Sequence, residues 1–138
     1  MAAIEISVTG QKKVGTLMNE FNQKFPYLGL RIYTAEAKNR KPGEPFTPYR
    51  VPTDVTLASA RAEGAKGGSI SITGHKKIKT LEKEFDTIFG LYAQVVYCPK
   101  GCPAGKGYVT VGEQDEYTLS GFNEKCKEDG ANTYSYGE

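Results

Sequence analysis

The chain has 138 residues, of which 38% are hydrophobic and 25% charged, and its formal net charge is +2. This length suits one domain or two very small ones, and such a chain can bury a core without metals or disulfides. The balanced charge excludes a strongly basic nucleic-acid-binding protein, and the composition excludes a disordered one. No apolar run reaches the length of a membrane span and the start lacks a signal-peptide pattern, so we expect a cytoplasmic protein with no membrane partner.

The first half begins with segments of regular periodicity. Residues 4–8 alternate apolar and polar side chains, which predicts a half-buried strand. Apolar residues then recur at helical spacing and predict an amphipathic helix that ends at Pro26. The residues of this stripe are Val14, Leu17, Met18, Phe21 and Phe25. Alternation at Leu28, Leu30 and Ile32 predicts a second strand.

Two shorter elements follow a connector that is rich in Pro, Gly and Lys. The segment 49–51 predicts a weak strand, which Pro48 and Pro52 confine to a sheet edge. Residues 56–63 open with Thr56 close behind an acidic residue, and this order predicts an N-cap and a short helix.

The second half repeats the first. Residues 10–34 and 74–98 are identical at nine of 25 positions when they are aligned at an offset of 64. After a loop of variable length, residues 54–58 align with residues 116–120 at an offset of 62. The corresponding predicted elements are strands at 70–72, 93–97 and 108–111 and helices at 78–89 and 118–126, with Gly90 ending the longer helix.

We therefore predict an α+β protein of two tandem β-α-β-β-α repeats, residues 1–66 and 67–138, the second with a flexible tail over about 131–138. Within each repeat the first two strands are expected to be parallel, with a right-handed crossover, and the third to return as a hairpin. Each sheet would then be mixed and covered by its long helix. A pseudo-twofold arrangement of repeats packed as one unit is expected, and independent beads are the alternative.

Both repeats carry the pattern T-G-x-K-K-[VI]-x-T-L-x-x-E-F, followed by a strand that ends in Tyr and then by [DE]-x-T-L-[AS]. With it the chain resembles a group of uncharacterised bacterial proteins with duplicated small α/β repeats. The resemblance runs from about Ile4 to Gly130. Its positions are mostly those of core and capping residues, so it carries no catalytic residue over to this chain.

Paired lysines follow a glycine at the same predicted strand-to-helix turn in both repeats. They are Lys12 and Lys13 in the first and Lys76 and Lys77 in the second. Free backbone N–H groups and the helix dipole attract anions at such a turn, which favours two anion-binding sites. The segment lacks the glycines of a phosphate-binding loop, and solvated surface lysines are the alternative.

A second group of candidate residues could form a basic and aromatic face in the first repeat. It consists of Arg31, Tyr33, Lys38, Arg40, Lys41, Tyr49 and Arg50.

The cysteines are Cys98, Cys102 and Cys126, and His75 is the single histidine. The spacing between Cys98 and Cys102 fits neither a zinc knuckle nor a thioredoxin motif. We expect reduced thiols and neither a metal nor another cofactor. A disulfide between Cys98 and Cys102, or a metal held by the three cysteines and His75, are the alternatives.

The sequence favours a small non-catalytic binding or protein-interaction module whose partner is an unknown protein or peptide. The alternative is a weak nucleic-acid or phosphate binder that uses the lysine pairs. An enzyme or redox protein centred on His75 and the cysteines is the third class. No nucleophile or carboxylate pair has the spacing of a triad or dyad, so an enzyme is not favoured.

Overall fold

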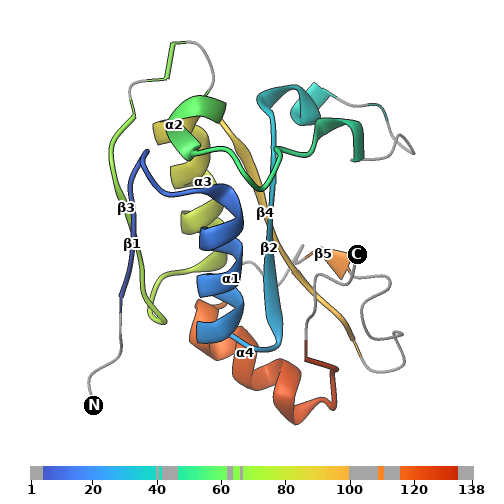
Figure 1. Ribbon diagram of the computed structural model, residues 1–138. Coiled ribbons are helices and arrows are strands. Elements are labelled where there is room, and N and C mark those ends of the chain that lie inside the picture. Colours follow the sequence, from blue (N-terminus) through green and yellow to red (C-terminus); the bar gives the residue numbers. More distant parts are fainter. Residues whose placement is uncertain are drawn as a thin grey trace.

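The computed structural model describes residues 5–39, 41, 47–61, 64–65, 67–99, 109–110 and 116–133. The protein has an α+β fold in which two long helices lie between a two-stranded and a three-stranded antiparallel sheet (Figure 1). The first half contains β1 (Ile6–Val8), α1 (Val14–Lys24), β2 (Leu28–Tyr33), the 3-10 helices η1 (Ala35–Asn39) and η2 (Thr47–Tyr49), and the short helix α2 (Leu57–Ala60). The second half contains β3 (Ile70–Ile72), α3 (Ile78–Phe89), β4 (Tyr92–Tyr97), β5 (Val109–Thr110) and α4 (Leu119–Glu128).

The two long helices form where the apolar stripes predict them. In α1 the stripe residues Val14, Leu17, Met18 and Phe21 are buried, and in α3 the buried residues are Ile78, Leu81, Phe85 and Phe89. The helix α3 ends at Gly90, whose φ of 65° is the left-handed conformation that glycine adopts without steric cost.

The short helices α2 and α4 begin with the predicted threonine caps. The Thr56 hydroxyl accepts a hydrogen bond from the N–H of Ser59 at 3.1 Å. The Thr118 hydroxyl accepts one from the N–H of Gly121 at 3.0 Å. Each cap satisfies one N–H that the first helical turn leaves without an intrahelical acceptor.

The sheets do not form within the repeats, so the prediction of a mixed sheet with a parallel strand pair in each half is wrong. Strand β1 pairs antiparallel with β3, and Ser7 lies opposite Ser71. Strand β2 pairs antiparallel with β4 over its whole length, from Leu28↔Tyr97 to Tyr33↔Tyr92. Strand β5 then adds to the other edge of β4. Both sheets are therefore shared between the two halves.

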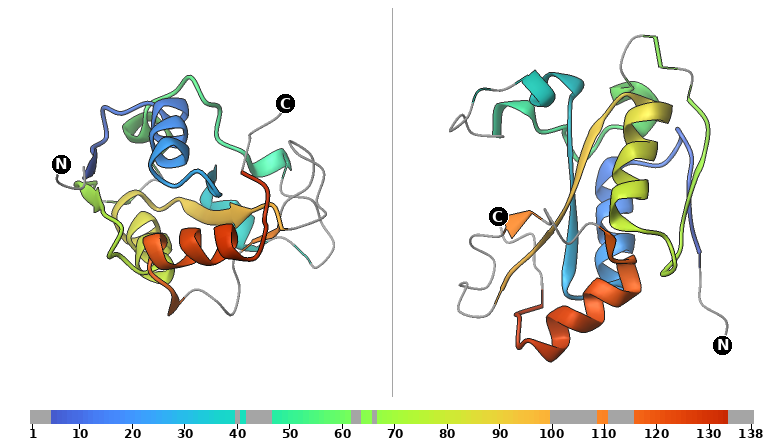
Figure 2. Two further views of the ribbon diagram at one scale, coloured as in Figure 1. Left: turned by 90° about the horizontal axis from the view of Figure 1, so that it is seen from below. Right: turned by 180° about the vertical axis from the view of Figure 1, so that it is seen from behind.

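The physical reason for this difference is the position of the helices. In Figures 1 and 2 the helices α1 and α3 lie between the β1–β3 pair and the β2–β4–β5 sheet. A helix between β1 and β2 prevents these strands from pairing with each other. The inner faces of both sheets instead bury Val8, Leu30, Ile72 and Val95 against the helices in one hydrophobic core.

The helix α4 closes one end of this core, as the view from below shows (Figure 2). The ring of Phe122 packs edge-on against that of Tyr97, with their centroids 5.0 Å apart. The Asn123 side chain accepts a hydrogen bond from the N–H of Tyr27 at 2.9 Å.

The first residues of the predicted tail form backbone hydrogen bonds. The N–H groups of Ala131 and Asn132 donate to the carbonyls of Cys126 and Cys98, respectively. Residues 134–138 lie outside the described part of the chain.

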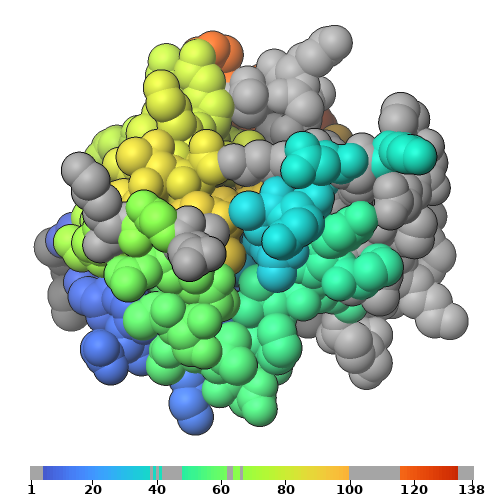
Figure 3. Space-filling view, turned by 90° about the horizontal axis from the view of Figure 1, so that it is seen from above, coloured from blue at the N-terminus to red at the C-terminus, as the bar shows by residue number. Residues whose placement is uncertain are grey.

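The weak edge strand of the first half is reduced to one bridge, between Arg50 and Tyr33. The segment leaves the edge of β2 at Pro52, which cannot donate a ladder hydrogen bond. In the view from above, the green segments near residues 50–60 lie on the surface between the start of α1, in blue, and η1, in cyan (Figure 3). Of the strand predicted at 108–111, only residues 109–110 lie in the described part of the chain.

Because both sheets join the two halves, the chain should unfold in a single transition. Replacing the fully buried Phe85 by Ala should lower the free energy of unfolding by about 3–5 kcal/mol. It should keep one transition in urea, monitored by tyrosine fluorescence and circular dichroism together. The exposed Thr87 on the same helix is the control, and Thr87→Ala should change stability by less than about 0.5 kcal/mol. Two separate transitions would contradict a core shared by both halves.

Candidate binding site

Three of the four predicted anion-binding lysines are engaged in ion pairs. The ammonium group of Lys12 contacts the carboxylate of Glu20, and that of Lys76 contacts Glu84 in the same way. The Lys77 ammonium lies 3.2 Å from Glu116. Lys79, with Lys77 beside it, hydrogen-bonds the Glu116 carboxylate and lowers its pKa. Lys13 is exposed and occupies the N-cap position of α1 without a side-chain capping bond.

Some of the backbone donors that an anion would need at these helix ends are also occupied. In α1 the N–H groups of Val14 and Gly15 donate to the carbonyls of Val55 and Thr53, each at 2.9 Å. In α3 the N–H of Ile78 donates to the Tyr117 carbonyl at 3.0 Å. These bonds satisfy N–H groups that would otherwise be available for an anion at the helix N-terminus. The lysine sites stay a prediction without support from this geometry.

The predicted basic and aromatic face is only partly assembled. Arg31 and Arg50 line one pocket. Tyr33 is buried and packs against the ring of Tyr92, so it does not belong to an exposed face. Tyr49 is half-buried and Lys41 exposed, whereas Arg40 and the side chain of Lys38 lie outside the described part of the chain.

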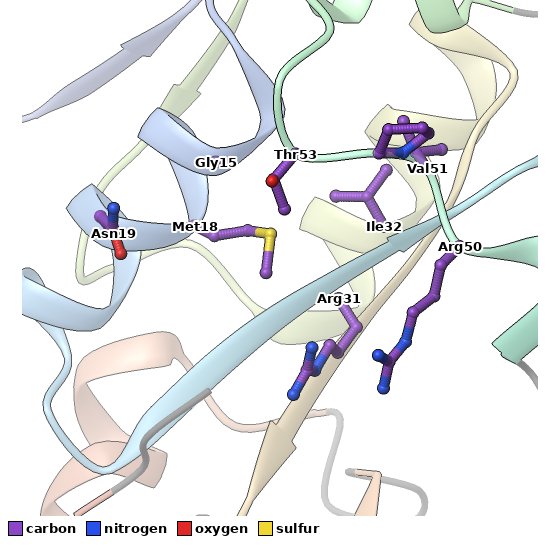
Figure 4. Close-up of a pocket in the computed structure, with 9 residues that line it drawn as sticks. Gly15, Met18, Asn19, Arg31, Ile32, Arg50, Val51 and Thr53 are labelled. Carbon is purple, nitrogen blue, oxygen red and sulfur yellow. The ribbon is translucent and has the colours of Figure 1, made fainter. Parts of the chain in front are cut away.

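The pocket that holds the two arginines lies between α1, the open edge of β2 and the segment 50–53, and has a volume of about 520 Å³. Its lining residues are Gly15, Met18, Asn19, Arg31, Ile32, Arg50, Val51, Pro52 and Thr53. In Figure 4 the side chains of Arg31 and Arg50 extend on one side of β2, and Met18 and Thr53 lie on the other side. The pocket therefore wraps around the edge of the strand. Its volume lies in the usual range for small-ligand sites.

The wall of this pocket contains backbone groups of β2. The N–H of Val51 donates to the carbonyl of Ile32 at 3.1 Å, so the polar groups of Ile32 face away from β4. The N–H of Ile32 faces the same side as its carbonyl. Among the backbone hydrogen bonds between the described segments, none has this N–H as its donor, which places a donor at the edge of the strand.

In the second half, a carboxylate side chain of the long helix occupies the position that matches this pocket. Glu82, which aligns with Met18 at the offset of 64, belongs to α3. Its carboxylate accepts a hydrogen bond from the N–H of Val95, on β4, at 3.0 Å. The two halves thus differ in one respect at this place: a carboxylate fills the position on α3 and a thioether on α1.

Sequence reasoning missed Met18, Asn19 and Thr53 as pocket residues, because it assigned Met18 to the core stripe. A signal was present in the alignment of the repeats. Glu82 interrupts an otherwise apolar stripe at the position of Met18, and a charged residue inside such a stripe indicates a specific partner for its carboxylate.

The expectation of reduced cysteines is wrong for Cys98, which is disulfide-bonded, whereas Cys126 is free and buried. Cys102, the third cysteine of the chain, lies outside the described residues. Among the residues described, no helix is long and apolar enough to cross a membrane.

His75 is exposed at the turn before α3. In the described ranges, no group of three His, Cys, Asp or Glu side chains is arranged to hold a metal ion. The metal tetrad considered from the sequence also needs Cys102, which lies outside those ranges.

Comparison of the chain with protein-family models, with curated proteins and with solved structures gives no match. The resemblance to bacterial duplicated-repeat proteins therefore stays an expectation from the sequence pattern.

The hydrogen bond from Val95 to Glu82 predicts a specific sensitivity in α3. Glu82→Met removes the acceptor and should destabilise the protein by about 1–3 kcal/mol, because it leaves a strand-edge donor without a partner. Glu82→Gln keeps an acceptor oxygen and should cost less. Urea denaturation of both variants measures the difference, and equal costs would show that the acceptor is unimportant.

The state of the cysteines can be measured directly. An intrachain disulfide uses two of the three cysteines, so unfolded, unreduced protein should titrate one thiol with Ellman's reagent, and three after reduction. In the folded protein Cys126 should react slowly, because burial raises the pKa of its thiol to about 11 and little thiolate exists at neutral pH. Three reactive thiols without reduction would contradict the disulfide.

Proposed function

We propose that the chain is a non-catalytic binding module built from a duplicated unit, and that it binds a protein or peptide at the pocket beside β2. The observation that carries this proposal is the difference between the halves. The same helix-to-strand position is closed by Glu82 in the second half, and in the first half it belongs to a pocket.

Recurring contacts support the duplication. Hydrogen bonds between the same alignment positions occur in both halves: Val14 to Val55 and Ile78 to Tyr117, Leu57 to Lys12 and Leu119 to Lys76, and Ala58 to Gly10 and Ser120 to Gly74. The ion pair from Lys12 to Glu20 likewise matches the one from Lys76 to Glu84. Independent folds would have no reason to share these contacts pair by pair.

The strand registers support a pseudo-twofold axis through both sheets. Ser7 pairs with Ser71, the residue 64 positions later. Arg31 pairs with Gln94, 63 positions later. In each ladder, equivalent residues thus face each other at the centre of the pairing, as they do across a twofold axis.

The change of offset between the two ladders has a local origin. The connection from Phe25 to Leu28 is one residue longer than the connection from Phe89 to Leu91. With this one-residue shift, Ile32 corresponds to Val95. Both of these residues belong to the hydrophobic core, so the shifted alignment matches side chains of the same environment.

The pocket offers groups that bind and orient a ligand. Arg31, Arg50 and Asn19 supply hydrogen-bond donors, and Met18 and Val51 supply apolar surface. This mixture of an apolar lining with a few polar groups is typical of binding sites. A protein or peptide partner can place one side chain into a pocket of this size while the rest of the partner lies across the surface.

A fragment screen tests this function. Binders should move the ¹⁵N–¹H signals of Gly15, Asn19, Ile32 and Thr53, which line the pocket, and should be recovered chemically unchanged. Asn19→Trp narrows the opening and should weaken their binding at least about tenfold, the size of a change of 1.4 kcal/mol in binding free energy.

The control is Lys83→Trp, the same substitution at the aligned, exposed position of α3. Binders that map to the lysine pairs, or that leave the pocket signals unmoved, would contradict the proposed site. Conversion of a bound compound would contradict a non-catalytic role.

A further inference from the structure

We infer that the pocket beside β2 is specific for a carboxylate group, held by Arg31, Arg50 and the N–H of Ile32. This inference rests on the proposed binding function and names the chemistry of its ligand. Four observations carry it: the carboxylate bound inside the second half, the residue that replaces it, the charge of the lining, and the shape of the pocket.

The second half shows which group this strand edge accepts. The carboxylate of Glu82 takes the hydrogen bond of Val95 at 3.0 Å. Hydrogen bonds to an ionised acceptor are shorter and stronger than those between neutral groups. The fold therefore already contains one carboxylate seated between a long helix and the edge of β4 that faces away from β2.

In the first half, the strand edge presents the backbone donor, but the helix does not provide a carboxylate at the position of Glu82. Ile32 presents its N–H at the corresponding edge, and Met18 stands at the position of Glu82. A methionine thioether is only a weak hydrogen-bond acceptor and carries no charge. An incoming carboxylate would provide the group that Glu82 provides in the second half.

The charge of the lining favours the same ligand. Arg31 and Arg50 are the charged residues of the lining, and both are positive. Arg31 is 6% exposed, so its charge acts from a site with little solvent around it and is weakly screened. An arginine has five N–H donors, so the inference does not require that either guanidinium lack another partner.

The arrangement fits a carboxylate better than a tetrahedral phosphate. The planar guanidinium matches the planar carboxylate by two parallel hydrogen bonds. The remaining wall is apolar, with Met18, Ile32 and Val51, and it suits the methylene groups of an acidic side chain. Both a glutamate side chain of a partner and a free carboxylic acid present this chemistry.

Titration with matched probes tests the inference. N-acetyl-glutamate methylamide should bind at least tenfold more tightly than N-acetyl-glutamine methylamide, because an ionised acceptor adds about 1.4 kcal/mol or more over a neutral one. The Ile32 amide proton should move downfield.

Acetate serves as the free-acid probe. Saturation by acetate assigns the site to small acids, and saturation by the glutamate probe alone assigns it to an acidic side chain. Arg50→Gln, at an exposed position, should weaken binding of the glutamate probe at least about tenfold.

Equal binding of the glutamate and glutamine probes at the pocket would overturn the carboxylate inference and leave the binding function standing. Inorganic phosphate binding there as tightly as the glutamate probe would also overturn it. If neither the fragments nor any of these probes moves the pocket signals, the proposed function fails together with it.

A second variant tests the equivalence with Glu82 inside the protein. Met18→Glu introduces the missing carboxylate from α1. It should keep the melting temperature at or above that of the parent protein, protect the Ile32 amide from hydrogen exchange, and abolish binding of the glutamate probe. Leu17→Glu, one position earlier and fully buried, is the control and should lower the melting temperature sharply. A Met18→Glu protein as destabilised as the control would overturn the inference.

Discussion

The antiparallel pairing of β2 with β4 is the constraint on which the rest of the structure depends. All six residues of β2 are buried, so both faces of this strand are covered, and its partner strand, β4, comes from the other half. The ladder places α1 and α3 on the same face of the sheet. The ladder also leaves two edges outside the pairing: the edge of β2 that faces away from β4, and the edge of β4 that faces away from β2. Residues of the same half cover each of these edges, and the two halves do so differently.

That difference connects the fold to the proposed function. On β4 the edge is completed by β5 and by the carboxylate of Glu82. On β2 the chain pairs at Arg50 and then leaves toward α1. The departure of the segment after Val51 opens the pocket and leaves the N–H of Ile32 in its wall. On the proposed duplication, one copy completes its strand edge with its own carboxylate, and the other copy holds the proposed binding pocket.

Much of the secondary structure could be predicted from the sequence, because helical stripes and threonine caps are local signals. The strand partners could not. Alternation at Leu28 and Leu30 shows which face is buried, but it does not say which strand lies alongside, and a βαβ unit was the simplest local solution. For the site, Arg31 and Arg50 were among the predicted residues, but their chain positions alone did not indicate a common pocket. The bridge between Arg50 and Tyr33 brings them to the same face.

The most direct test of this account is a nuclear Overhauser measurement between the α protons of Leu30 and Val95. These residues face each other in the ladder of β2 and β4. They form a pair whose backbone N–H and C=O groups point away from each other, so their α protons approach closely. The account predicts a strong cross-peak for this pair and another for Ile32 with Ala93, which are also opposite each other. Absence of both, with cross-peaks between β1 and β2 in their place, would show that each half forms its own sheet and would contradict the shared ladder.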